Sequence, residues 1–207
     1  MRILGLTGSI GMGKSTAAAM LRRLGVPVFD SDAAVHRLLA KGGAAVPKIR
    51  AAFPDAVKDG AVDRQTLGAR VFADPAALRR LESIVHPLVR REEARFLRAA
   101  GRRRTPLVVL DIPLLFESRG EGRCDATLLV SAPRAVQEAR VLGRPGMTRA
   151  KLAGIRSQQM PEAQKRRRAD FIVLTGGGKR RTFEALRRIV RALRRGPMRE
   201  RRGSRHA

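Results

Sequence analysis

A short glycine-rich segment near the start of the chain constrains the fold more than any other feature. Residues 8–15 read GSIGMGKS and match the pattern G-x-x-x-x-G-K-[ST] at every fixed position. An apolar run at residues 3–6 predicts a buried strand before this segment, and apolar residues recur at helical spacing after it. A strand, a glycine-rich turn and a helix N-terminus form a cradle for phosphate groups, because backbone N–H groups and the helix dipole both favour an anion. The sequence therefore predicts a nucleoside triphosphate site.

Individual residues of this phosphate loop have expected roles. Lys14 is expected to reach the β- and γ-phosphates of ATP, and the Ser15 hydroxyl is expected to ligate Mg²⁺. The other loop residues expected to bind ATP are Gly8, Gly11, Met12, Gly13 and Thr16. ATP and Mg²⁺ are therefore the cofactors that the sequence predicts.

Short apolar runs alternate with longer helical periods along the chain, which indicates an α/β fold. None of the runs alternates cleanly, as is typical of parallel strands buried on both faces. The expected strands are residues 2–7, 27–30, 107–112, 127–131 and 171–174. We expect a three-layer phosphate-loop kinase fold, in which a five-stranded parallel sheet carries a helical insertion for the phosphate acceptor and a lid.

The expected organisation is one kinase domain over residues 1–195. The acceptor insertion is expected at about residues 42–100 and the lid at about residues 140–160. Pro87 lies within a helical pattern of the insertion, and we expect it to kink or break the helix near His86. Residues 196–207 are basic with almost no apolar side chains, which predicts a disordered tail.

Carboxylates follow two of the expected strands, where ligands of open α/β sheets bind. Asp32, two residues beyond Asp30 at the end of the second strand, could accept the proton of an attacking hydroxyl or help to position Mg²⁺. It could instead only cap the helix that follows. Asp111 ends the apolar run at residues 107–110 and could hold Mg²⁺ directly or through water, although many strands end in Asp.

Two arginines lie four residues apart around an expected helix end, and they could close over the transferring phosphate. Arg140 and Arg144 would there neutralise its developing charge. The alternative is a solvated basic face, which is common in a chain so rich in arginine. For Arg156, Gln159 and Lys165 we favour that solvated face.

The formal net charge of +26, from 44 Lys and Arg against 18 Asp and Glu, raises the question of a nucleic-acid partner. The chain has no Trp or Tyr for base stacking, and its arginines are spread along its whole length. We therefore expect phosphorylated substrates and no nucleic-acid partner. No apolar run approaches the ~20 residues of a membrane span, no signal peptide is expected, and Cys124 is the single cysteine. These features predict a cytoplasmic protein without a membrane partner, and they indicate no oligomeric state.

Taken in order, the motifs resemble those of the dephospho-coenzyme A kinase family. The matching segments are LTGSIGMGKST at residues 6–16, VFDSD at 28–32, DIPLLFE at 111–117, the arginines at 140 and 144, QMP at 159–161, and Lys165 with Ala169-Asp170. The resemblance implies transfer of the ATP γ-phosphate to the ribose 3′-hydroxyl of dephospho-coenzyme A. It also implies that Asp32, Lys14 and Arg140 are catalytic and that dephospho-coenzyme A and ATP are the partners.

Some positions depart from the family pattern. Ser9 stands where glycine is usual, and residues 174–177 read LTGG where D-N-x-G is commoner. Two other interpretations stay open at this point. One is a different small-molecule kinase, such as a nucleotide or nucleoside kinase, and the other is an RNA-binding nucleotide switch.

Overall fold

The computed structural model describes residues 1–72 and 74–195, so the expected basic tail at residues 196–207 lies outside the described residues. The chain divides into two compact units. The first unit consists of Met1–Phe29 together with the chain from Arg104 onward, and the second consists of Asp30–Arg103.

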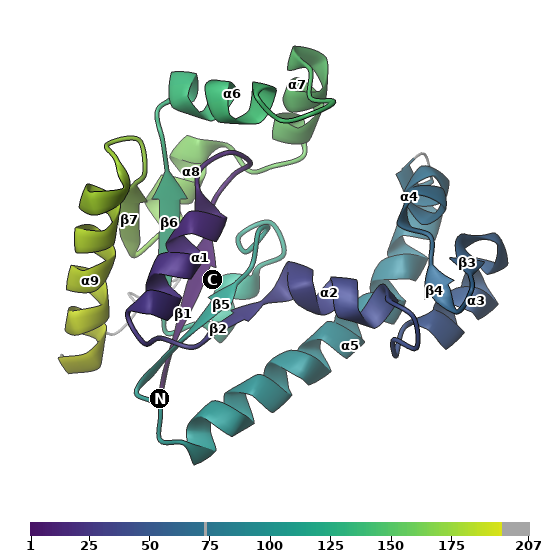
Figure 1. Cartoon of the computed structure of the whole chain (residues 1–207), viewed down its shortest axis with the longest axis horizontal. Helices are drawn as coiled ribbons and strands as arrows, with labels where there is room; N and C mark the ends of the chain where they lie inside the picture. Colours follow the sequence, from purple (N-terminus) through teal and green to yellow (C-terminus); the bar gives the residue numbers. More distant parts are fainter. Residues whose placement is uncertain (73, 196–207) are drawn as a thin grey trace, which may run out of the picture. The chain divides into compact units, whose positions relative to one another are not determined.

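A five-stranded sheet with the order β2-β5-β1-β6-β7 forms the centre of the first unit (Figure 1). The strands are β1 (Arg2–Thr7), β2 (Val28–Asp30), β5 (Leu107–Asp111), β6 (Ala126–Ser131) and β7 (Phe171–Leu174). β1 pairs in parallel with β5 and β6, and β6 pairs in parallel with β7. The expected five-stranded parallel sheet is confirmed. Its strands are short apolar runs, which is typical of a parallel sheet that is covered on both faces.

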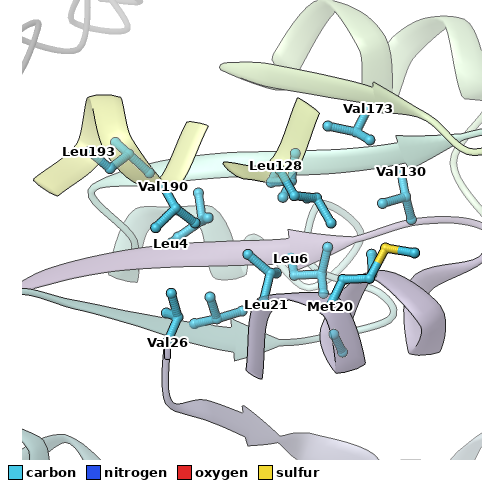
Figure 2. Packing of buried hydrophobic residues seen from close by; sticks show 14 of the residues in the cluster. Leu4, Leu6, Met20, Leu21, Val26, Leu128, Val130, Val173, Val190 and Leu193 are labelled. Carbon is cyan, nitrogen blue, oxygen red and sulfur yellow. The ribbon is translucent and has the colours of Figure 1, made fainter. Parts of the chain in front are cut away.

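Two helices cover one face of this sheet, α1 (Lys14–Arg23) and α9 (Lys179–Arg195). Figure 2 shows Leu4 and Leu6 of β1 close to Leu21 of α1 and Val190 of α9. All four side chains are buried. This packing fixes α1 against the sheet and so fixes the loop between β1 and α1, where the phosphate-binding motif lies.

The short 3₁₀ helix η2 (Gly120–Arg123) precedes β6. Three helices lie between β6 and β7 in the sequence: α6 (Arg134–Leu142), α7 (Arg149–Ser157) and α8 (Glu162–Arg168). Figure 1 shows α6 and α7 beyond the carboxyl end of β6. Thr148 caps α7, because its side chain accepts a hydrogen bond from the Lys151 N–H at 3.2 Å.

The second unit is mainly helical and has its own apolar core, which includes Leu38, Ile49, Phe53, Leu67 and Val85. Its elements are α2 (Ser31–Leu39), α3 (Val46–Ala52), the 3₁₀ helix η1 (Pro54–Ala56), the hairpin strands β3 (Val57–Lys58) and β4 (Ala61–Val62), α4 (Arg64–Phe72) and α5 (Pro75–Arg102).

Asp63 begins α4 by accepting hydrogen bonds from the N–H groups of Gln65 and Thr66. The ammonium of Lys58, 3.0 Å away, and these N–H groups hold the pKa of Asp63 far below its usual range.

α5 runs from Pro75 to Arg102 with Pro87 inside it, so of the expected kink or break near His86 the break does not occur. A proline removes one intrahelical hydrogen bond. Here the residues on either side, including Leu81, Val85 and Leu88, pack into the core of the second unit. This packing holds the helix together across the missing bond.

None of the helices within residues 1–72 and 74–195 is both long enough and apolar enough to cross a membrane.

Candidate active site

The phosphate loop has the backbone that its glycines allow. Gly11 has φ 76° and Gly13 has φ 87°, both in the left-handed region. A Cβ atom at Gly11 would lie 2.5 Å from Cγ2 of Val141, so a side chain would not fit there. No side chain within the described residues caps the start of α1 at Gly13. The first N–H groups of α1 are therefore available to an anion, as the motif predicts.

Lys14 and Asp111 meet at the carboxyl ends of two neighbouring strands. Leu6 of β1 pairs with Asp111 of β5, which places this carboxylate beside the start of the loop. The Lys14 Nζ atom lies 2.7 Å from Asp111 Oδ1, and the side chain of Asp111 is 3% exposed. A carboxylate and the exposed hydroxyl of Ser15 in the first turn of α1 are hard oxygen donors. This donor chemistry fits Mg²⁺, which prefers such oxygens.

Arg140 is an exposed residue, but its guanidinium reaches the phosphate loop. Its guanidinium donates hydrogen bonds to Oγ1 and O of Thr175, at 3.0 and 2.8 Å, and to O of Gly11 at 3.4 Å. Thr175 in turn donates from Oγ1 to O of Met12 at 2.7 Å. The segment after β7 thus joins Arg140 to the loop.

The other expected ATP contacts differ in what their side chains can offer. Thr16 is exposed, whereas Met12 is buried and its Sδ accepts a hydrogen bond from the Ala132 N–H at 3.0 Å. The side chain of Met12 therefore offers ATP little exposed surface. Arg144 is exposed beyond α6, and its side chain has no hydrogen bond or ion pair with a described residue.

Asp32 lies in the second unit, at the second residue of α2, and it is exposed. The helix cap is Asp30, whose Oδ1 accepts a hydrogen bond from the Ala33 N–H at 2.9 Å. The interpretation of Asp32 as the cap is therefore wrong. The carboxylate of Asp32 has no hydrogen-bond or ion-pair partner among the described residues.

A family model described as dephospho-CoA kinase matches residues 2–180, which is most of the chain. The chain belongs to the dephospho-CoA kinase family. The similar dephospho-CoA kinase of Rhodospirillum rubrum is 57% identical over 205 residues, covering 98% of this chain and 97% of that protein. That of Paramagnetospirillum magneticum is 68% identical over 166 residues, covering 80% of this chain and 78% of that protein.

The fold agrees with this membership. The crystal structure of the protein TT1252 from Thermus thermophilus superposes with a TM-score of 0.81 at 42% identity, covering 92% of this chain and 96% of that one. The chain is thus a phosphate-loop kinase that uses ATP, as the sequence predicts.

The structure brings further side chains of this kinase to the loop, and the sequence interpretation had placed them elsewhere. Lys165 is fully buried, pairs with Glu117 at 2.8 Å, and lies 3.2 Å from Oγ of Ser9, so its assignment to a solvated face is wrong. Gln159 contacts the Ile10 N–H at 3.2 Å. A usable signal was Glu117 itself, an acidic residue directly after the apolar run at residues 114–116. A buried acid at such a position needs a cation close by.

Proposed function

We propose that this chain transfers the γ-phosphate of ATP to the ribose 3′-hydroxyl of dephospho-coenzyme A, giving coenzyme A and ADP, with the residues named below in the roles given. This reaction is the last step of coenzyme A biosynthesis. The observation that carries the proposal is a pair of contacts at the phosphate loop of a chain that belongs to the dephospho-CoA kinase family. Lys14 of the loop contacts Asp111, and Arg140 contacts the carbonyl oxygen of Gly11.

The donor side uses charges that the structure already brings together. The N–H groups of the loop and the ammonium of Lys14 would hold the β- and γ-phosphates. Asp111 and Ser15 would hold Mg²⁺, which would supply positive charge to offset the negative charge of the phosphates. Lys14 and Asp111, which now neutralise each other at 2.7 Å, would each find an opposite charge on the bound nucleotide and metal.

The acceptor side needs a proton acceptor and a means to stabilise the moving phosphoryl group. Asp32 would accept or orient the proton of the 3′-hydroxyl, since its carboxylate is exposed and is not the helix cap. Arg140, together with Arg144, would stabilise the negative charge on the phosphoryl group in flight. Phosphoryl transfer through a loose transition state depends mainly on such positioning and electrostatic stabilisation.

The remaining assignments complete the proposal. The helical insertion at about residues 42–100 would hold dephospho-coenzyme A, because its basic residues suit a pyrophosphate, and residues 140–160 would act as the lid. ATP and dephospho-coenzyme A are sufficient as partners, with no nucleic acid or membrane required. A cytoplasmic location suits Cys124, which forms no disulfide within the described residues.

An acceptor panel with product analysis tests this function. The protein is incubated with ATP, Mg²⁺ and either dephospho-coenzyme A, adenosine, AMP, shikimate or RNA, and the products are analysed by mass spectrometry and ³¹P NMR. We expect phosphate on the 3′-oxygen of dephospho-coenzyme A and at most slow transfer to the other compounds. Preferred phosphorylation of a nucleoside or nucleotide would support a different small-molecule kinase. Tight, salt-dependent RNA binding without transfer to any acceptor would support a nucleotide switch.

A further inference from the structure

A buried ion pair lies directly against the phosphate loop. Lys165 of α8 is 0% exposed, and its Nζ lies 2.8 Å from Oε1 of Glu117. The same ammonium donates a hydrogen bond to Oγ of Ser9 at 3.2 Å. Because the burial of two charges is costly even when they pair, an ion pair at this place is weak evidence for a purely stabilising role.

Glu117 extends this cluster to the segment that joins α7 and α8. Its Oε1 also accepts a hydrogen bond from the N–H of Met160 at 2.9 Å, while its buried Oε2 has no hydrogen-bond partner among the described residues. Burial raises the pKa of Glu117, but the hydrogen bonds from Lys165 and Met160 outweigh burial and hold it below the usual value. The carboxylate is therefore charged at neutral pH and remains paired with Lys165.

Side chains from two directions hold the next residue of the loop, Ile10. Its N–H donates to Oε1 of Gln159 at 3.2 Å, and its carbonyl oxygen accepts from Nε2 of Gln137 at 2.7 Å. Arg156 in turn donates from Nε to Oε1 of Gln137 at 3.2 Å. The N–H and the carbonyl group of Ile10 are thus both hydrogen-bonded to side chains, one from α6 and one from the segment between α7 and α8.

We propose that Glu117 and Lys165, together with Gln159, are positioning residues that hold Ser9 and Ile10 in the loop conformation that receives the phosphates of ATP. None of these three side chains needs to touch ATP. They act through the loop backbone, and they join the loop to the segment between α7 and α8. This inference rests on the proposed function only in naming ATP phosphates as the group that the loop receives.

The same part of the fold supplies a matched control. Arg168 of α8 forms an ion pair with Glu121 of η2, and its guanidinium lies 5.3 Å from the ring centre of Phe116. This second pair also joins α8 to the segment between β5 and β6. Within the described residues, Arg168 contacts Sδ of Met160 but no residue of the phosphate loop, so removal of this pair tests the packing around α8 and not the loop itself.

The test compares the double variant Glu117→Gln/Lys165→Met with the control Glu121→Gln/Arg168→Met. Each removes both charges of one pair, so neither leaves a lone buried charge. The main readout is the Kd for ATP with Mg²⁺, measured by calorimetry without an acceptor. Steady-state KM values for ATP and for dephospho-coenzyme A and the Tm are measured on the same preparations.

We expect the first double variant to remain folded and to bind ATP at least about 10-fold more weakly, with the KM for the acceptor changed less than about 2-fold. The control variant should bind ATP like the unmodified protein. An unchanged Kd in the first variant, or an equal loss in both variants, would overturn the proposal. If the first variant fails to fold, the Kd for ATP is measured in the single variants Ser9→Ala and Gln159→Leu instead. Unchanged Kd values in both single variants would also overturn the proposal.

The two proposals fail in different ways. Absence of phosphate transfer by the unmodified protein would reject the proposed function, while the comparison of Kd values for ATP would still test the positioning role.

Discussion

The Nζ atom of Lys14 lies 2.7 Å from Oδ1 of Asp111, and this contact joins the first residue of α1 to the last residue of β5. The register of the parallel strands makes the contact possible, because Asp111 pairs with Leu6, shortly before the loop begins. A cation and an anion are thus held together beside the loop, and we propose that they bind the phosphates and the metal, respectively. The two charges neutralise each other, and either can turn to a bound ligand of opposite charge.

Lys14→Ala should abolish phosphate transfer, because it removes a charge-assisted contact with the β- and γ-phosphates. The protein should stay folded with a lowered Tm, since the loss of one partner of a buried pair costs up to about 3–5 kcal/mol. The double variant Lys14→Ala/Asp111→Ala should recover part of the Tm and stay inactive. Near-normal turnover of Lys14→Ala at saturating ATP would show that the role given to Lys14 is wrong.

Arg140→Ala should lower kcat far more than it weakens ATP binding. An arginine that stabilises the transition state is worth roughly 10³–10⁵ in rate in related phosphoryl-transfer enzymes. Thr175→Val is the matched control, because it removes the hydroxyl that Arg140 contacts and leaves the guanidinium in place. Its kcat should fall much less. A weaker Kd for ATP with an unchanged kcat in Arg140→Ala would mean that Arg140 contacts only the ground state.

Asp32→Asn should lower kcat by about 10²–10⁴, the usual contribution of a general base, while the Kd for ATP stays nearly the same. Asn has almost the same shape but cannot take up the proton. Asp30→Asn is the paired variant, because Asn caps helices as well as Asp does and α2 should remain intact. A greater loss in Asp30→Asn would assign the proton to the other carboxylate. A loss of only a few-fold in both variants would mean that the proton leaves by another route.

The Glu117–Lys165 pair should make stability depend on acid pH. The pKa of Glu117 is lowered from its ordinary value of 4.5. A carboxylate with a lowered pKa stabilises the fold above its unfolded pKa, and this contribution is lost as the pH falls through the folded value. As the pH falls from 6 to below 4, the free energy of unfolding of the unmodified protein should therefore decrease more than that of Glu117→Gln/Lys165→Met. Urea unfolding at several pH values measures this difference, and parallel curves would contradict the assignment.

Deletion of the chain from Gly196 should leave both kcat and Tm nearly unchanged. These residues contain almost no apolar side chains, so they have little surface to bury against the rest of the protein. The truncated and full-length chains are compared in the same kinetic and melting assays. A Tm several degrees lower would show that the segment packs against the folded domain.

The sequence predicts the sheet well, because each strand is an apolar run bounded by polar or turn residues. All five strands lie within one residue of their expected bounds. The uninterrupted α5 was not predictable from Pro87 alone, since tertiary packing on both sides of a proline offsets the lost hydrogen bond. The local sequence pattern shows that Pro87 removes a hydrogen bond of the helix, but it does not show the tertiary packing that offsets this loss.

In the candidate site, too, some features follow from local sequence patterns and others depend on contacts between distant residues. The loop and Asp111 follow from local patterns, whereas the burial of Lys165 depends on Glu117, which is distant in the sequence. In a basic run such as residues 165–168, nothing local distinguishes the buried lysine from the exposed arginines. The choice between Asp30 and Asp32 as the cap depends on where α2 begins, and sequence patterns place helix ends only to within a few residues.

The rate of ADP release with and without dephospho-coenzyme A tests the central claim most directly. With ATP and Mg²⁺ at saturation, we predict slow release without the acceptor. Dephospho-coenzyme A should accelerate it by several orders of magnitude, with one coenzyme A formed for each ADP. A rate that dephospho-coenzyme A leaves unchanged would contradict the account.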